Sequence, residues 1–232
     1  MRGLTGKKLA LGFMMTGALC GIAQNATAQG ARLSFTVHVR NYAGVDPKTL
    51  ANAEKRATGI FRESRVETHW VTTLGPSREK FEETTDPNSS GLSDLELNVL
   101  SRDMSNRLGL PNKVMGITPG KGADRRQIYV LYSHVEAFSQ IAHERLYAEH
   151  QYIGATEALI LGSVIAHEIG HALLSMDSHS DTGIMRGIWD INDLLEAERG
   201  RLVFTPEQSE VIRAEVARRM SQCDKVASEF AQ

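Results

Sequence analysis

The sequence predicts an α+β fold, because strand patterns and helix patterns follow one another along 232 residues without a break that would separate two domains. Residues 32–40 (RLSFTVHVR) alternate between apolar and polar side chains, as a strand with one buried face does. Asp46 and Pro47 predict the start of a helix, whose apolar residues follow at helical spacing: Leu50, Ala53, Ala57, Ile60 and Phe61. Residues 66–71 and 127–132 predict two further strands.

Helical patterns dominate the second half of the chain and occupy residues 134–150, 156–174 and 205–222. Thr205 and Pro206 open the last helix, since threonine suits an N-cap and proline the first turn, and the glutamine three positions after the threonine can close a capping box. Residues 84–91 and 116–123 have the composition of loops, and residues 92–108 are predicted to be helical or irregular.

The first 28 residues predict a secretory signal peptide. Basic residues precede a mostly apolar stretch over residues 9–22, and Ala26 and Ala28 place small side chains at the two positions that a signal peptidase recognises. The apolar stretch is shorter than the roughly 20 residues that span a bilayer, which disfavours a membrane anchor. We therefore expect residues 1–28 to be removed and residues 29–232 to form one exported domain, periplasmic or secreted.

The net charge disfavours two classes of partner, and the cysteine content argues against an internal disulfide. The predicted signal peptide carries three basic and no acidic residues, so its removal leaves 23 basic against 28 acidic residues and a net charge of −5. This charge argues against a nucleic-acid partner and against an anionic membrane surface. Cys20 would leave with the signal peptide, so Cys223 has no partner for an internal disulfide, and the core or a metal has to stabilise the fold.

The most informative segment is residues 155–174, ATEALILGSVIAHEIGHALL. Successive residues of an α-helix are about 100° apart, so His167 and His171 lie about 40° apart on one helix surface. Their imidazoles can reach one ion from successive turns, and zinc accepts neutral imidazole nitrogens. Glu168 can flank a water molecule without binding the metal and take its proton as general base.

The residues between and before these histidines are mostly apolar, which predicts a helix that is buried on most sides. Buried imidazoles and a buried carboxyl group are costly unless they have partners or a task, so a metal site explains them better than chance. The alternative is a pair of hydrogen-bonded core histidines with a capped glutamate. A catalytic zinc ion also needs a third protein ligand. The downstream candidates are Asp177, His179, Asp181, Glu196 and Glu198.

The segment His167-Glu168-Ile169-Gly170-His171, followed by Ser178-His179-Ser180 and Gly183-Ile184-Met185, resembles the metzincin zinc peptidases. In that clan a third ligand follows the helical histidines, and a tight turn carries a methionine beneath the metal. The resemblance implies that His179 is the third ligand and that Met185 is the turn methionine, which does not bind zinc. The chain also looks similar to a group of uncharacterised exported bacterial members with the same longer connection between ligands.

The resemblance also implies an architecture. Metzincins combine a twisted mixed sheet and a backing helix with the active-site helix, the Met-turn and a C-terminal helix. The substrate backbone is added to the sheet as an extra strand, and residues 127–132 are expected to be the edge strand or its neighbour.

Two departures leave alternatives open. The clan usually has a glycine three residues after the second histidine and the third ligand three residues later, where this chain has Leu174 and Asp177. Asp177 is therefore the less favoured third ligand. Glu196 lies 25 residues after His171, the arrangement of thermolysin-like peptidases, and is a further alternative.

We therefore predict that residues 29–232 are a zinc metalloendopeptidase domain that binds one catalytic Zn²⁺ through His167, His171 and His179. Glu168 is predicted to be the general base, and the partner is a peptide or protein substrate. One rival is a hydrolase of non-peptide amides that uses the same site. The other is a zinc-holding binding protein without catalysis, which would not need a carboxylate beside the metal.

Overall fold

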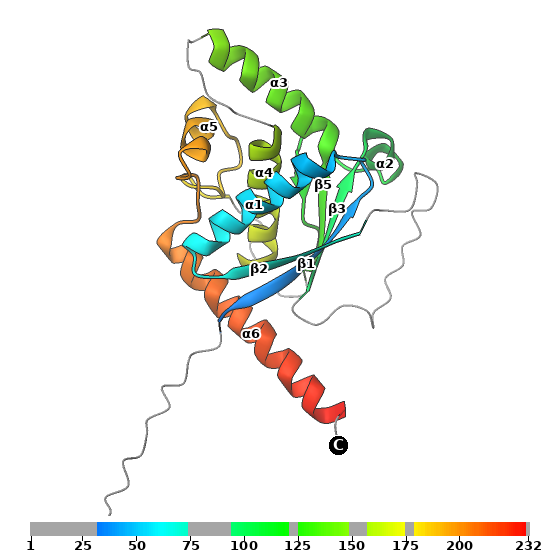
Figure 1. The fold of residues 1–232 in the computed structure, drawn as a ribbon, viewed down its shortest axis with the longest axis vertical. Coiled ribbons are helices and arrows are strands. Elements are labelled where there is room, and N and C mark those ends of the chain that lie inside the picture. Colours follow the sequence, from blue (N-terminus) through cyan, green and yellow to red (C-terminus); the bar gives the residue numbers. More distant parts are fainter. Residues whose placement is uncertain (1–31, 74–93, 121–124, 149–156, 175–178, 231–232) are drawn as a thin grey trace, which may run out of the picture. The chain divides into compact units, whose positions relative to one another are not determined.

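The computed structural model describes residues 32–73, 94–120, 125–148, 157–174 and 179–230 (Figure 1). The predicted signal peptide, the predicted loop at residues 84–91 and the alternative ligand Asp177 lie outside the described residues. The described part of the chain is an α+β structure, which confirms the predicted fold class.

A five-stranded mixed sheet organises the fold, with the order β2-β1-β3-β5-β4. The strands are β1 (Ser34–Asn41), β2 (Glu67–Thr73), β3 (Leu95–Leu100), β4 (Gly116–Ile117) and β5 (Gln127–Leu131). All neighbouring strands are parallel except β4, which runs antiparallel to β5. The short strand β4 is therefore an edge, and β5, predicted to be an edge or its neighbour, is the neighbour.

Strand β3 corrects the prediction that residues 92–108 are helical or irregular. It lies at the centre of the sheet with all six residues buried, and the short helix α2 (Arg102–Arg107) follows it. The polar side chains on its second face have partners on neighbouring strands: Glu96 forms an ion pair with Arg40 at 3.2 Å, and Asn98 donates to the Gln127 side chain at 3.2 Å. Such pairing allows acidic and amide residues inside a central strand.

Helix α1 (Pro47–Glu63) begins where the sequence predicts, and the Asp46 side chain caps it by accepting from the Thr49 backbone N–H at 3.0 Å. Its buried face is the predicted one: Leu50, Ala53, Ala57, Ile60 and Phe61. This face packs against α4 (Glu157–Leu174), the helix that carries the two histidines. The two helices approach closely at Gly162, where an added Cβ would lie 2.4 Å from the Ala53 carbonyl oxygen.

Helix α4 is the most buried helix of the fold. Within the described residues it is the one helix long and apolar enough to cross a membrane, but 89% of it is buried inside the structure, so it is a core helix. The sheet, α1 and α6 surround it (Figure 1). The remaining helices are α3 (Tyr132–Ala148), α5 (Ile191–Glu198) and α6 (Pro206–Phe230).

Helix α6 begins with the predicted capping box. The Gln208 backbone N–H donates to the Thr205 hydroxyl at 3.3 Å, and the Thr205 backbone N–H donates to the Gln208 side chain at 3.0 Å. The segment between α4 and α6 is thereby held near the histidines, because Gln208 also donates to the Ser180 hydroxyl at 3.2 Å.

Candidate metal centre

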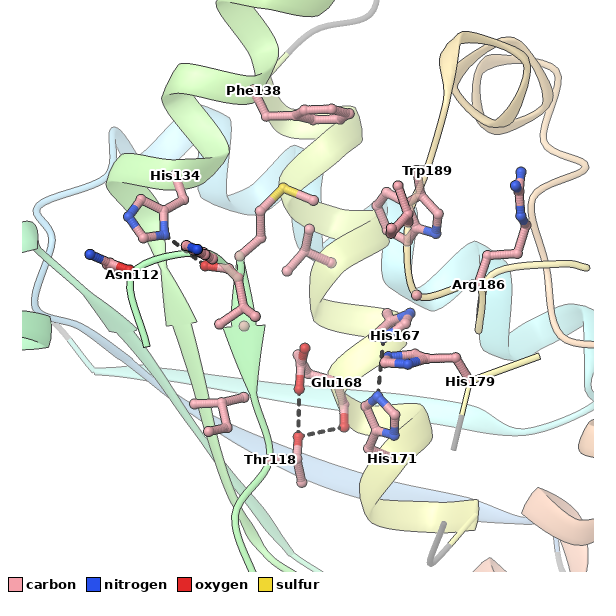
Figure 2. A pocket seen from close by; sticks show the side chains of 18 of the residues that line it. Asn112, Thr118, His134, Phe138, His167, Glu168, His171, His179, Arg186 and Trp189 are labelled. Atoms are coloured by element: carbon pink, nitrogen blue, oxygen red, sulfur yellow. Dashed lines mark hydrogen bonds between the residues drawn. The ribbon is translucent and has the colours of Figure 1, made fainter. Parts of the chain in front are cut away.

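Three imidazoles meet at one side of α4. His167 and His171 lie on successive turns of the helix, and His179 approaches from the segment that follows it (Figure 2). The Nε2 atoms of His167 and His171 are 3.1 Å apart, and one nitrogen of each of the three rings lies within 4.8 Å of the others. Among the described residues, these are the three that form a group able to hold a metal ion.

The meeting of three rings favours a metal ion over a hydrogen-bonded pair of core histidines, although the 3.1 Å between the two helical Nε2 atoms fits both arrangements. Two nitrogens at about 2.05 Å from a tetrahedral zinc ion lie about 3.3 Å apart, close to the distance between the two helical rings. A histidine pair alone would need no third ring. Yet the His179 ring centroid lies 5.3 Å from that of His167 and 5.1 Å from that of His171.

A hydrogen bond to the backbone fixes the orientation of the His167 ring. Its Nδ1 lies 2.7 Å from the Ile184 carbonyl oxygen, so Nδ1–H donates there and the Nε2 lone pair faces the other imidazoles. Burial lowers the pKa of His167 to about 4; the bond to Ile184 opposes this shift, and the neighbouring histidines add to it. The ring is therefore neutral near pH 7, the form that binds zinc. The Trp189 indole N–H donates to the same carbonyl at 3.3 Å.

Glu168 lies beside the imidazoles and faces the sheet (Figure 2). Its side chain is buried, and the Thr118 hydroxyl lies 2.8 Å from its Oε2. Burial raises the pKa of Glu168 to about 7, while the hydrogen bond from Thr118 lowers it. A carboxyl group with such a pKa can take up and release a proton near neutral pH, as a general base must.

Met185 packs beneath the histidines. It is buried, and its Sδ would lie 2.6 Å from a Cβ added at Gly170, between the two helical histidines. The turn around it is held at both ends, since the Ser180 N–H donates to the Met185 carbonyl at 2.9 Å and the Ile184 N–H to the Val203 carbonyl at 3.0 Å. Gly170 therefore has no room for a side chain, because the methionine occupies that space.

The same segment supports His179. An added Cβ at Gly187 would lie 2.8 Å from His179 Nδ1, so the glycine lets the backbone pass close behind the ring. His179 is exposed, unlike the two helical histidines, and this contact is one restraint on its position.

Two buried arginines hold the C-terminal end of α4. The Arg219 guanidinium donates to the Ala172 carbonyl at 3.0 Å, and that of Arg125 donates to the His171 carbonyl at 3.4 Å. Cations at this end of a helix interact favourably with its dipole and satisfy carbonyls that lack helical partners. They stabilise the last turn, which carries His171.

A cavity of about 590 Å³ opens beside the metal centre. The imidazoles and Glu168 form its floor, and edge strand β4 runs along one side. Three exposed large apolar residues line it from three separate segments: Val114 before β4, Ile141 on α3 and Ile188 after Met185. An apolar rim with a few polar groups beneath it is typical of a ligand-binding cleft.

The other predicted ligands lie elsewhere or cannot be placed. Glu196 forms ion pairs with Arg199 at 3.2 Å and with Arg201 at 2.5 Å, and the bond from Arg201 is the main cause that lowers its pKa to about 2. The structure thus gives Glu196 a role on α5 away from the imidazoles, against the thermolysin-like alternative. Asp181 does not join the group either, and Asp177 lies outside the described residues.

Two residues at the site, Gly116 and Thr118, were not predicted from the sequence. Both belong to a segment that was predicted to be a loop, and a two-residue strand is too short to show alternation. No pattern in the chain indicates that this segment contacts Glu168.

No known protein-family model matches the chain, and no curated protein matches it in sequence. Similar solved structures include the archaemetzincin of Methanopyrus kandleri, at 12% sequence identity and a TM-score of 0.46 over 82% of this chain and 99% of that chain. A zinc-dependent peptidase from Methanocorpusculum labreanum (strain Z) is similar at 13% identity and a TM-score of 0.44, over 76% of this chain and 99% of that chain. Similarity at this level does not assign their activity to this chain, so function has to be argued from the site.

Proposed function

We propose that the chain is a zinc-dependent metallopeptidase in which His167, His171 and His179 hold one zinc ion and Glu168 is the general base. The observation that carries the proposal is the convergence of three imidazoles next to a buried carboxyl group on the floor of a cleft. Three imidazole nitrogen donors with an open side match a catalytic rather than a structural zinc site.

When bound, zinc supplies a Lewis acid that polarises a carbonyl group and makes water acidic enough to lose its proton near neutral pH. Glu168 takes the proton from the attacking water as the water oxygen bonds to the carbonyl carbon of the substrate. The C–N bond then breaks, and Glu168 passes the proton to the departing amine nitrogen. Atoms balance with one water consumed per bond, and the carboxylate is regenerated.

Met185 fits the role of the turn methionine in this proposal. Its buried thioether lies against Gly170, between the two helical ligands, and its chain neighbour Ile184 orients His167. A soft apolar side chain there excludes water from the back of the site without competing for the metal.

The substrate we propose is a peptide or protein segment with a large apolar side chain. Strand β4 is an edge of the sheet and runs along the cleft, so an extended peptide can pair with it while its scissile bond reaches Glu168. The exposed side chains of Val114, Ile141 and Ile188 would be covered by an apolar group of the substrate. The basic residues and apolar stretch at the N-terminus support export of the enzyme, and its acidic balance disfavours nucleic acid and anionic membranes as partners.

Elemental analysis of the protein purified from residue 29 onward, coupled to a chelator-sensitive cleavage assay on mixed peptides, tests this proposal. We expect close to one zinc per chain and cleavage that stops with a chelator and returns with zinc. Glu168→Gln should keep the zinc and lose cleavage by about 100-fold or more. A metal-free protein would overturn the metal site, and undiminished cleavage by Glu168→Gln would overturn the assigned base. Zinc without cleavage of peptides would favour a binding protein or a hydrolase of other amides.

A further inference from the structure

Edge strand β4 passes unusually close to Glu168. A Cβ added at Gly116 would lie 2.5 Å from Cγ, 2.7 Å from Cδ and 2.6 Å from Oε1 of that side chain. Real Cβ atoms do not approach other heavy atoms so closely, so any other residue at position 116 would displace the carboxyl group. Glycine is required here by the close approach of strand and side chain, and not by a left-handed backbone.

The residue two positions further contacts the same glutamate. The Thr118 hydroxyl lies 2.8 Å from Glu168 Oε2 and 2.9 Å from the Glu168 carbonyl oxygen, and both contacts are drawn in Figure 2. Residues two apart on an extended segment point to the same side, so Gly116 and Thr118 both face α4. Gly116 leaves space for the Glu168 side chain, and Thr118 donates a hydrogen bond to it.

We propose that Gly116 and Thr118 together position the carboxylate of Glu168 for proton transfer, with Thr118 as a positioning residue that does not touch the substrate. This inference rests on the proposed function, in which Glu168 is the general base. Thr118 holds Oε2 and leaves Oε1 to accept the proton. Without the hydroxyl, a buried carboxylate oxygen would lose its protein donor and the side chain could rotate away from the imidazoles.

The arrangement has a consequence for the substrate. The strand that holds the base is also the edge with which an extended peptide can pair. One strand would then set the position of the scissile bond and that of the carboxylate relative to each other. A base held by the substrate-binding strand needs little rearrangement when substrate arrives, which lowers the barrier to the proton transfer.

A purely structural role is the competing explanation, since the Thr118 hydroxyl also reaches a backbone carbonyl of α4. Thr118→Val keeps the shape of the side chain and removes the hydroxyl, whereas Thr118→Ser keeps the hydroxyl. We expect Thr118→Val to lower kcat by about tenfold or more with KM within about twofold, and to keep its zinc. Thr118→Ser should recover most of the kcat. Thr72→Val, an exposed threonine on the opposite edge strand β2, is the matched control and should behave as the wild type.

Combining Thr118→Val with Glu168→Gln distinguishes a role in positioning the carboxylate from a purely structural role. If Thr118 acts through the carboxylate, Thr118→Val should have no further effect on the residual rate of Glu168→Gln. An equal fall in rate in both backgrounds, or a Thr118→Val enzyme with kcat within twofold of the wild type, would overturn the inference. If Glu168→Gln itself cleaves normally, the proposed base is wrong; if only the Thr118 variants are normal, the base stands and the positioning role fails.

Substitution of Gly116 provides a test that measures stability and does not depend on catalysis. Gly116→Ala should lower the melting temperature in the wild-type background, because the added methyl collides with the Glu168 side chain. In the Glu168→Ala background that side chain is absent, so the same substitution should cost less. An equal loss of Tm in both backgrounds would show that the contact is not the cause. Zinc content measured on each variant keeps the comparison among metal-loaded proteins.

Discussion

At the scale of single residues, the identity of the third ligand decides whether the site has the three protein donors that a catalytic zinc ion needs. His179 lies with His167 and His171 although it is exposed and follows the end of α4. Imidazole is also the commoner zinc donor, whereas the aspartate at position 177 is supported by the spacing pattern alone.

We predict that His179→Ala lowers the zinc content of the purified protein by about tenfold or more after dialysis, because two ligands hold zinc weakly. Asp177→Ala should retain close to the wild-type content. Inductively coupled plasma mass spectrometry on both variants, with wild type dialysed alongside, measures this directly. The opposite order would assign the third position to Asp177.

Much of the metal centre could be predicted at this scale. The spacing of His167, Glu168 and His171 fixes their common helix face, because helix geometry depends on local sequence alone. Two contacts could not be predicted in this way. The contact of Ile184 with His167 joins residues 17 apart, and that of Thr118 with Glu168 joins residues 50 apart. Such contacts depend on how the chain folds back on itself, and no local pattern records them.

At the scale of helices and strands, an element could be predicted from the sequence where its apolar residues repeat with a clear period. Helix α1 was predicted with its cap and its whole buried face because five apolar residues repeat at helical spacing within this helix of 17 residues. Strand β3 was missed although residues 95–99 alternate between apolar and polar side chains, because this alternation covers a short segment that leads directly into helix α2. Strand β4 was missed because pairing with β5, and not its own sequence, makes it a strand.

The contact between α1 and α4 gives a prediction about stability. Gly162→Ala should destabilise the fold by about 1–3 kcal/mol, because its methyl group would overlap the Ala53 carbonyl and the Arg56 side chain at the helix crossing. Gly59→Ala on α1 is the control: an added Cβ there meets nothing within 4 Å, so it should stabilise the helix by about 0.5–1 kcal/mol. Urea unfolding of both variants, followed by circular dichroism, measures the two signs. Equal effects would mean that the helices do not cross closely at Gly162.

The cleft between α3, β4 and the segment after Met185 gives a prediction about specificity. Ile188 is 84% exposed at the rim, so Ile188→Asp should leave the fold intact and remove an apolar contact with the substrate. We expect kcat/KM to fall about tenfold for peptides with a large apolar side chain and to change little for peptides with small ones.

Val71→Asp is the control for this experiment, because Val71 is 45% exposed on β2 and does not line the cavity. Competition between two labelled peptides in one reaction gives the ratio of their kcat/KM values. A uniform loss for both peptides would point to a general disturbance of the site, and no loss would exclude Ile188 from substrate recognition.

At the scale of the whole molecule, the proposed metal ion would stabilise the fold together with the core. If the predicted signal peptide is removed, Cys223 is the one cysteine left, so no internal disulfide can form. A metal ion held by the three imidazoles would join the central helix α4 to the segment that leads into α5, in addition to the packing around Met185 and Phe204 and the hydrogen bond between His167 and Ile184. A ligand that binds the folded state alone stabilises it by mass action.

Zinc should therefore raise the free energy of unfolding, by about 4 kcal/mol when free zinc is a thousandfold above its dissociation constant. We expect a chelator to lower the Tm of the wild-type protein and added zinc to restore it. His167→Ala with His171→Ala should abolish both responses, since the remaining imidazole cannot hold the ion. Glu168→Gln should respond as the wild type does, because the carboxylate is not a ligand in this site. Differential scanning calorimetry in a zinc-buffered solution measures the Tm of all three proteins. If the Tm of the wild type did not change with zinc, a metal ion that bridges α4 and the following segment would be contradicted.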